Sequence, residues 1–256
     1  MVALQDLQTA GTQGSAKSIE YRCQADLNLY DSPECSRLAT QAAKGRQLRV
    51  QQSEFVSLES SSLTAVPICL CEDDYPAWLS LQDLDGIALA STPYQAIAVS
   101  PDQIKTRLPA VIWFAKTALR QPNTYLWGGT IGPNYDCSGL IQAAFADLGI
   151  WLPRDAYQQE GFTQAIPLQD LEPGDLVFFG SPEKATHVGL YLGAGAYIHS
   201  SGKEQGRNGI GIDQLSGEGD PVSQTYFAQL RGSGRVMASY LPISQRPNSQ
   251  RPNFQD

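Results

Sequence analysis

The feature that most constrains this chain is an apolar stripe that begins at a cysteine. Counting from Cys137, apolar residues recur three, four, seven, eight and eleven positions later, which places them on one face of a helix. They are Leu140, Ile141, Ala144, Phe145 and Leu148. The spacing predicts a helix over about 137–148 that stops at Gly149. Cys137 therefore begins a buried face, and a sheet predicted downstream is the expected packing partner.

Two interpretations of Cys137 follow from this position. Free cysteines are among the most buried residue types, so a core thiol is the ordinary interpretation. A helix N-terminus, however, offers unpaired N–H groups and a dipole that favour a thiolate. The neighbouring Asp136 opposes thiolate formation, so it is expected either to cap the loop or to bind a ligand. The helix alone leaves these alternatives open.

The chain has only two histidines, and both fall in a predicted strand pair downstream of the cysteine. In the first strand, 187–192, apolar residues alternate with His187, Gly189 and Tyr191, which puts His187 on the face opposite the apolar side chains. The second strand, 196–201, carries His199. Each histidine taken alone is an unremarkable strand residue, so their relative register decides whether they form a site.

The predicted hairpin loop sets that register. A three-residue loop at 193–195, with a left-handed Gly195, would pair Leu192 with Ala196. His199 would then lie diagonal to His187 on the same face, about 7–8 Å away at the backbone. Gly189 would leave the space between the rings open. A two- or four-residue loop without a bulge would turn the two rings to opposite faces.

A thiol, a base and an orienting group form a recognisable catalytic set. A thiol needs a nearby base, and the base needs a second group that fixes its tautomer. We assign Cys137 as nucleophile, His187 as base and His199 as orienter, although chemistry alone would also permit the histidines to exchange roles. Zinc binding by the same three residues is the rival hypothesis. It is weaker because neither a short-spaced ligand pair nor a fourth ligand is evident.

Charge and hydropathy exclude several classes of partner. The formal charge is −8 and no run of Lys and Arg occurs, which argues against nucleic acid and anionic membrane as partners. No secretory signal is visible in residues 1–20, and no window reaches the ~18 apolar residues of a membrane-spanning helix. We therefore expect a cytoplasmic protein in which the five cysteines are free thiols.

The chain divides into two unlike halves between polar ends. Short apolar runs with period-two alternation predict a small β-barrel in the first half, and a helix followed by antiparallel strands predicts an α+β domain in the second. Ser100 and Pro101 are a predicted helix start, and Pro109 is a second place where that helix could begin or bend. The predicted segments are a disordered N-terminus (1–18), the β-barrel (19–90), a linker (91–104), the α+β domain (105–242) and a disordered tail (243–256).

Both halves resemble known families. The strings "YLWGGTIGPNYDCSGLIQAAFADLGIWLPRDAYQQ", "LEPGDLVFF" and "THVGLYLGAGAYIHSSG" resemble the NlpC-type cysteine peptidases, papain-like thiol proteases that cut bacterial cell-wall peptides. The strings "LNLYDSPECSRLATQAAKGRQLRVQ" and "AWLSLQDLDG" resemble bacterial SH3 (SH3b) domains. The combined layout is similar to the γ-D-glutamyl-L-diamino acid endopeptidases of murein peptide recycling. This resemblance implies a papain-like peptidase domain after an SH3-like β-barrel, with no metal and no other cofactor.

The resemblance also implies roles for individual residues. It gives Cys137, His187 and His199 the catalytic roles assigned above, and adds Tyr125 as a group that assists the oxyanion.

Four further residues match substrate-binding positions or lie beside the nucleophile. Asp155 matches the residue that holds a free substrate amino group, although Ala156 stands where many relatives have serine. Ser138 matches a peptide contact, and Asp136 is a candidate for another. Tyr75 matches an SH3-domain residue that lines the mouth of the active site. Its acidic neighbours could attract an amine, but a solvated loop is the simpler expectation for them. These neighbours are Glu72, Asp73 and Asp74.

The implied reaction is hydrolysis of the γ-D-glutamyl-L-diamino acid bond, through an acyl-enzyme, in peptides with a free N-terminal L-Ala such as L-Ala-γ-D-Glu-diaminopimelate. The absence of a visible export signal favours imported wall fragments over the intact wall as substrate. A papain-like acyltransferase using the same triad is one alternative. A non-hydrolytic module that binds wall peptides is another, although the filled triad argues against it. A monomer is assumed.

Overall fold

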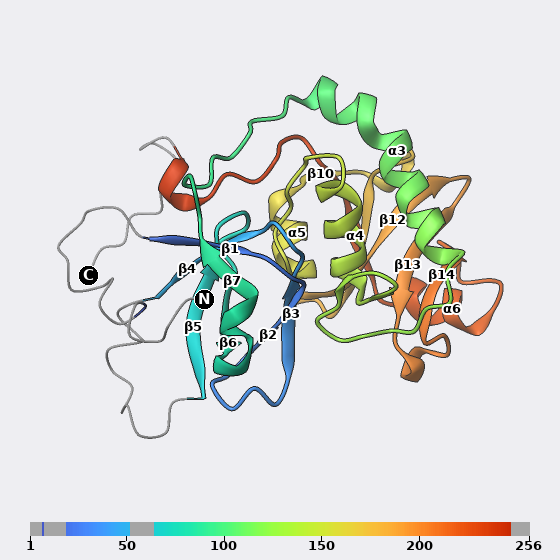
Figure 1. The fold of residues 1–256 in the computed structure, drawn as a ribbon. Helices are drawn as coiled ribbons and strands as arrows, with labels where there is room; N and C mark the ends of the chain where they lie inside the picture. Colours follow the sequence, from blue (N-terminus) through green and yellow to red (C-terminus); the bar gives the residue numbers. More distant parts are fainter. Residues whose placement is uncertain (1–6, 8–18, 52–63, 247–256) are drawn as a thin grey trace. The chain divides into compact units, whose positions relative to one another are not determined.

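The computed structural model describes residue 7 and residues 19–51 and 64–246, and the chain divides into two compact units (Figure 1). Unit 1 combines Met1–Ala98 with Tyr240–Asp256, and unit 2 is Val99–Ser239. The disorder predicted for both ends falls largely outside the described residues. Residues 243–245 of the predicted tail nevertheless form a 3-10 helix, and Gln245 accepts a hydrogen bond from Ala96 N at 2.8 Å.

Unit 1 is built on one antiparallel sheet of seven short strands, in the order β3-β2-β6-β5-β4-β1-β7. The strands are β1 (Glu20–Cys23), β2 (Leu27–Tyr30), β3 (Leu38–Ala42), β4 (Gln47–Val50), β5 (Ala65–Leu70), β6 (Pro76–Ser80) and β7 (Ile87–Leu89). Alternation buries Leu48 and Val50 on one face of β4, in line with the period-two pattern of this half. The string "AWLSLQDLDG" is only partly a strand, because a 3-10 helix, Leu81–Gly86, separates β6 from β7.

Unit 2 begins with α3 (Pro101–Leu119), which starts where the sequence predicted a helix start. Ser100 caps it, and the side chain of Gln103 returns a hydrogen bond to the Ser100 backbone at 2.9 Å. Pro109 lies inside this helix rather than at its start. The last residues of the predicted linker are therefore helical.

Three further α-helices, a six-stranded sheet and a two-stranded pair complete the α+β fold of unit 2. The sheet has the order β10-β15-β11-β12-β13-β14, and a short pair, β8 (Thr130–Ile131) with β9 (Asn134–Tyr135), stands apart from it. The helices are α4 (Cys137–Ala146), α5 (Ala156–Phe162) and α6 (Pro221–Phe227). The sheet strands are β10 (Gln164–Ile166), β11 (Leu176–Gly180), β12 (Ala185–Gly193), β13 (Ala196–Ser201), β14 (Gly209–Gln214) and β15 (Leu230–Arg235).

Each face of this sheet packs on a different cluster. On one face Phe178, Val188 and Ile198 join the core that contains the apolar stripe of α4, so the predicted packing of that helix on the sheet is confirmed. On the other face Phe179 and Tyr197 pack with Tyr226 from α6. Both histidines belong to the second face by strand alternation, so the cysteine meets them at the start of β12 rather than across the sheet surface.

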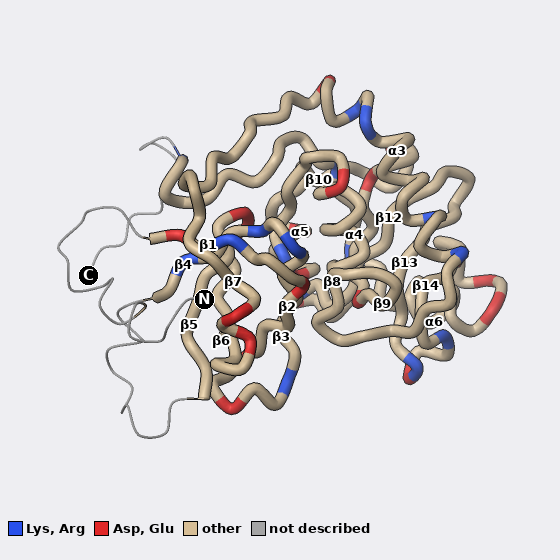
Figure 2. The backbone as a smooth tube through the Cα atoms, in the orientation of Figure 1, with Lys and Arg blue, Asp and Glu red and all other residues tan. Residues whose placement is uncertain are grey.

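Charged residues are scattered over both units with the two signs interspersed (Figure 2). None of the helices in the described ranges has the length and apolar character that crossing a membrane requires.

Candidate active site

Cys137 is the first residue of α4, and its sulfur lies against the backbone of β12. Its Sγ is 4.0 Å from the carbonyl oxygen of Thr186, and a hydrogen bond from the backbone of Val188 acts on the thiol. These two residues flank His187. The nucleophile predicted from sequence is therefore placed beside the predicted base.

The two histidines are in direct contact. Nε2 of His187 lies 2.6 Å from Nδ1 of His199, and the two rings meet edge to face. Because His187 uses Nε2 for this bond, Nδ1 is the nitrogen that remains for the thiol. Both rings are buried, and His199 is fully enclosed at 0% exposure.

A bulge produces this register where a longer loop was predicted. Tyr191 pairs with Tyr197, but Gly193 pairs with Ala196, so the turn has two residues and the ladder shifts at Leu192. The bulge restores the register that the predicted three-residue loop would have given, and both rings stay on one face. Gly195 has a φ of +79°, as the left-handed turn prediction required.

The space over Gly189 is filled rather than open. A Cβ at this position would lie 2.6 Å from Cδ2 of Tyr197, so the glycine seats the tyrosine ring beside His199. Tyr226 stacks on His187 with ring centroids 4.2 Å apart, and its hydroxyl lies 2.8 Å from Ser201 Oγ. Aromatic rings thus pack around the histidine pair and fix its orientation.

Two residues that the sequence analysis missed extend the histidine pair. His199 Nε2 lies 2.5 Å from Oδ2 of Asp213 on β14, and Oδ1 of Asp213 is paired with Arg207. Strand alternation could have flagged Asp213 had the strand 209–214 been predicted. Arg207 lies in a loop, and no sequence pattern marked it.

The start of α4 is held by a buried ion pair. Asp136 caps the helix by accepting from Gly139 N at 2.7 Å, and Arg154 donates to both of its carboxylate oxygens, at 3.1 and 2.6 Å. Arg154 also donates to Ser138 Oγ at 2.9 Å. Asp136 and Ser138 are therefore hydrogen-bonded to each other and to Arg154. The sequence analysis did not identify Arg154 as a site residue. Contact of Asp136 and Ser138 with substrate stays a prediction.

The glycines around the helix start are required by close backbone approach. A Cβ at Gly139 would lie 2.0 Å from the carbonyl oxygen of Gly129, and one at Gly129 would lie 2.6 Å from that of Asn134. Gly128 has a φ of +78°, and its N–H donates to Asp136 Oδ2 at 2.9 Å. These glycines therefore let backbone segments pass close to one another at the start of α4.

Burial keeps both partners of the thiol–imidazole pair neutral at rest. Desolvation, reinforced by Asp136, raises the pKa of the Cys137 thiol to about 12. Desolvation and the neighbouring His199 lower the pKa of His187 well below its usual value. The thiol therefore needs the imidazole at the moment of reaction, because the helix start does not ionise it in advance.

A pocket of about 460 Å³ opens beside His187. Tyr125 lines it, and burial together with the nearby Cys137 raises the pKa of this phenol, so the hydroxyl stays protonated and able to donate. Charged side chains also contribute to the wall. The other lining residues are Trp127, Thr186, Gly202, Lys203, Glu204, Gln205, Asn208, Tyr226 and Gln229.

Asp155 lies where the loop after α4 enters α5. Its backbone N–H donates to Gln158 Oε1 at 3.0 Å, and it directly follows Arg154, the residue that anchors the Cys137 helix. Asp155, the predicted amine-binding carboxylate, is thereby connected to the start of α4 through its neighbour Arg154. Its role in binding stays a prediction.

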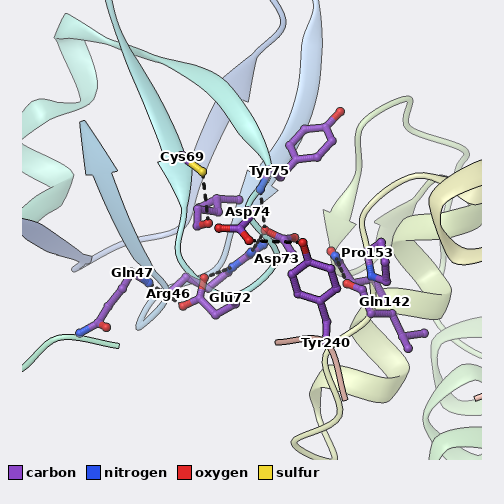
Figure 3. Close-up of polar contacts among 12 residues, drawn as sticks. Arg46, Gln47, Cys69, Glu72, Asp73, Asp74, Tyr75, Gln142, Pro153 and Tyr240 are labelled. Carbon is purple, nitrogen blue, oxygen red and sulfur yellow. Dashed lines mark hydrogen bonds and ion pairs between the residues drawn. The ribbon is translucent and has the colours of Figure 1, made fainter. Parts of the chain in front are cut away.

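The acidic run before Tyr75 is an ion-pair cluster with Glu72 and Asp73 buried and Asp74 partly buried, not a solvated loop (Figure 3). Arg46 pairs with Glu72 at 3.1 Å and with Asp73 at 3.0 Å, and Arg49 pairs with Asp74 at 2.7 Å. These carboxylates are neutralised inside unit 1, so the idea that they attract an amine is not supported either.

The same cluster fixes the backbone of Tyr75. Its N–H donates to Asp73 Oδ1 at 3.3 Å, and its carbonyl accepts from Leu70 N at 3.0 Å. Tyr75 belongs to unit 1, and its part in substrate binding stays a prediction.

The rival zinc hypothesis finds no support in the geometry. Both ring nitrogens of His199 are engaged, one by His187 and one by Asp213. Over the ranges that the structure describes, no group of three or more His, Cys, Asp or Glu side chains is arranged to hold a metal ion.

Comparison with known proteins identifies the class. Residues 122–230, which include Cys137 and both histidines, match the NlpC/P60 family, and residues 29–84 match the bacterial dipeptidyl-peptidase SH3 domain. The chain therefore carries an NlpC/P60 domain preceded by a bacterial dipeptidyl-peptidase SH3 domain. The predicted papain-like α+β fold after an SH3-like region is confirmed.

Individual relatives sharpen the placement. The chain is 35% identical over 146 residues to the γ-D-glutamyl-L-lysine dipeptidyl-peptidase of Bacillus subtilis, covering 56% of this chain and 47% of that protein. It is 42% identical over 85 residues to a γ-DL-glutamyl hydrolase of the same species, covering 32% of this chain and 21% of that protein. The matches thus span less than half the length of either relative.

Among solved structures, an NlpC/P60 family protein from Bacillus cereus matches with a TM-score of 0.45 and 22% identity. The match covers 90% of this chain and 66% of that one.

Proposed function

We propose that this protein is a cysteine endopeptidase that hydrolyses the γ-D-glutamyl-L-diamino acid bond of cell-wall peptides bearing a free N-terminal L-Ala. One observation carries the proposal. The Cys137 sulfur lies against β12 between Thr186 and Val188, and His187, the residue between them, is hydrogen-bonded to His199 at 2.6 Å. A buried nucleophile, base and orienter in this order form the arrangement that acyl transfer through a thiol requires.

The chemistry follows from the neutral resting pair. As the sulfur attacks the scissile carbonyl, Nδ1 of His187 takes the thiol proton, and the same nitrogen later gives it to the leaving amine. The backbone N–H groups at the start of α4 and the protonated Tyr125 hydroxyl are the donors for the oxyanion. Water then hydrolyses the acyl-enzyme with His187 again as base.

Two features support the substrate assignment. The relative from Bacillus subtilis that shares 35% identity is named for a γ-D-glutamyl-L-lysine substrate. Asp155 offers a carboxylate for a free α-amino group, as the family resemblance implies. On the side of His187, Lys203 and Glu204 give the pocket wall one charge of each sign, which suits a diamino acid carrying both an ammonium and a carboxylate.

The test uses three substrates that differ in accessibility of the N-terminus. We expect release of L-Ala-D-Glu from free L-Ala-γ-D-Glu-diaminopimelate, little from its N-acetyl form, and little from intact sacculi. Asp155→Asn should lower kcat/KM on the free tripeptide and leave the slow N-acetyl reaction unchanged. Release from sacculi but not from tripeptide would refute the recycling role. Aminolysis products with added amines would instead indicate an acyltransferase.

A further inference from the structure

We propose that Asp213 is a positioning residue that sets the tautomers of both histidines and thereby keeps the thiol-facing nitrogen of His187 free of a proton. The inference deepens the proposed function and rests on it for its catalytic meaning. Its structural content, the tautomer of each ring, is measurable without any substrate.

Three side chains form one continuous line of short hydrogen bonds. Nε2 of His187 meets Nδ1 of His199 at 2.6 Å, and Nε2 of His199 meets Oδ2 of Asp213 at 2.5 Å. His199 is 0% exposed and Asp213 is 2% exposed, so solvent does not offer a competing partner along this line. Each proton position in the line therefore depends on the next group.

The Asp213 carboxylate determines which atom donates in each hydrogen bond of this line. An ionised carboxylate only accepts, and Oδ1 of Asp213 is paired with Arg207, a cation that only donates. His199 must then carry its proton on Nε2, and a neutral imidazole has only one N–H, so Nδ1 is bare and accepts. His187 must donate from Nε2, which leaves its own Nδ1 bare and able to take the thiol proton.

Without Asp213, nothing fixes which of the two imidazoles donates the hydrogen bond between them. If His199 instead carried its proton on Nδ1, it would donate to Nε2 of His187, and the proton of His187 would move to Nδ1. In that tautomer His187 presents an N–H to the sulfur and cannot act as its base. The two arrangements have the same number of bonds between the rings, so the choice lies with the group beyond His199.

The fold builds this device from the pairing of β13 with β14. His199 pairs with Gly211, and Asp213 lies two residues further along β14, on the same face. A Cβ at Gly211 would lie 2.4 Å from Nε of Arg207, so the absence of a side chain there makes room for the guanidinium. Strand β14 thus supplies the carboxylate at Asp213 and the space for its counter-ion, Arg207, two residues earlier at Gly211.

The informative variant is Asp213→Asn, because Arg207 determines how the amide turns. Oδ1 faces Arg207, which can only donate, so the asparagine oxygen should turn to Arg207 and its NH₂ to His199. His199 Nε2 must then accept, which reverses every proton in the line. The double variant D213N/R207M removes that constraint and lets the amide oxygen turn back to His199.

Nitrogen-15 NMR of the full chain observes this directly, since the chain has only two imidazoles. We expect Nε2–H tautomers for both rings in the wild type, Nδ1–H tautomers in D213N, and partial return in D213N/R207M. The control is Asp175→Asn, which breaks another buried carboxylate–arginine pair of the same sheet, with Arg235. It should leave both tautomers as in the wild type.

Activity provides the second readout. We expect kcat of D213N to fall about 10²–10⁴-fold near neutral pH, as when a carboxylate that orients a catalytic histidine is replaced by an amide. D213N/R207M should recover at least about tenfold of that loss, and D175N should stay within a factor of two. Wild-type tautomers in D213N, or an Nδ1–H tautomer for His187 in the wild type, would overturn the inference. An inactive wild type with the expected tautomers would instead overturn the proposed function alone.

Discussion

Two cysteines of this protein, Cys137 and Cys69, have nearly the same surroundings by simple measures. Each is 6% exposed, and each lies beside an aspartate–arginine ion pair, Asp136–Arg154 for the first and Asp74–Arg49 for the second. Burial raises the pKa of Cys137 to about 12 and that of Cys69 to about 11. Acidity alone therefore does not favour Cys137 as the nucleophile.

The difference lies in what touches each sulfur. Arg49 donates directly to the Cys69 sulfur at 3.2 Å, so a cation that cannot accept a proton occupies the position of a base. At Cys137 the arginine is used on Asp136 and Ser138, and the sulfur faces the strand that carries His187. The comparison teaches that function here depends on a proton acceptor beside the thiol and not on a lowered resting pKa.

The largest expected effect is the difference in peptidase activity between serine variants of the two cysteines. Cys137→Ser should lower the rate of tripeptide hydrolysis by about 10³-fold or more, because the hydroxyl is a much weaker nucleophile in this setting. Cys69→Ser, the matched control, should stay within a factor of two. The measurement is release of L-Ala-D-Glu under single-turnover conditions. Comparable losses in both variants would break the comparison and point to a general structural effect.

Next in size is the cost of removing each arginine. Arg154→Met leaves Asp136 charged and buried at the start of α4, which should lower the free energy of unfolding of unit 2 by about 3 kcal/mol or more. The side chain of Arg49 is 25% exposed, so Arg49→Met should cost unit 1 only about 1 kcal/mol. Hydrogen exchange resolved by peptide reports each unit separately. A smaller loss for Arg154→Met than for Arg49→Met would contradict this reasoning.

How much of the fold and of the candidate site could be predicted depends on whether the sequence pattern that encodes each feature is local. The Cys137 helix, its packing on the sheet and the two histidine strands follow from periodicity within about fifteen residues. The bulge at Leu192 has no such signal, because it reflects the ladder as a whole. The sequence analysis reached the right register through the wrong loop, since a bulge and a longer loop shift the pairing equally.

Partners distant in sequence were the part that sequence reasoning missed. Arg154 reaches Asp136 across 18 positions, and Arg46 reaches Glu72 across 26, and only the folded chain shows that these charges neutralise each other in the interior. The acidic run was therefore expected to be solvated. Asp213 was missed for a related reason, because its contact with His199 depends on how β14 pairs with β13.

A third prediction sharpens the comparison by alkylation. At pH 7 iodoacetamide should modify Cys137 faster than Cys69, although burial raises the pKa of both thiols. His187→Gln should slow modification of Cys137 by about 10²-fold, the contribution typical of a positioned base, and leave Cys69 unchanged. Mass spectrometry of the labelled peptides measures both sites in one sample. Faster labelling of Cys69 in the wild type would show that acidity, not the adjacent base, governs these thiols.

The smallest expected effect compares the two units through pH. Both histidines lie in unit 2, and burial lowers the pKa of each, so below about pH 6.5 the unfolded chain binds protons that the folded unit does not. The stability of unit 2 should therefore fall as pH drops from about 6.5, by up to about 1.4 kcal/mol per pH unit for each histidine.

Unit 1 has no histidine among its residues, and burial raises the pKa of Glu72, which gives the opposite sign. As pH falls toward the range in which Glu72 titrates, the folded form of unit 1 binds more protons than the unfolded chain, so Glu72 makes unit 1 more stable. Hydrogen exchange at pH 6.5 and 5.5, corrected for intrinsic rates, should show the protection of the two units diverging. Glu72→Gln should remove the trend in unit 1 without changing that in unit 2. Parallel slopes in both units would mean that carboxylates common to both, and not the buried imidazole pair, control the acid response.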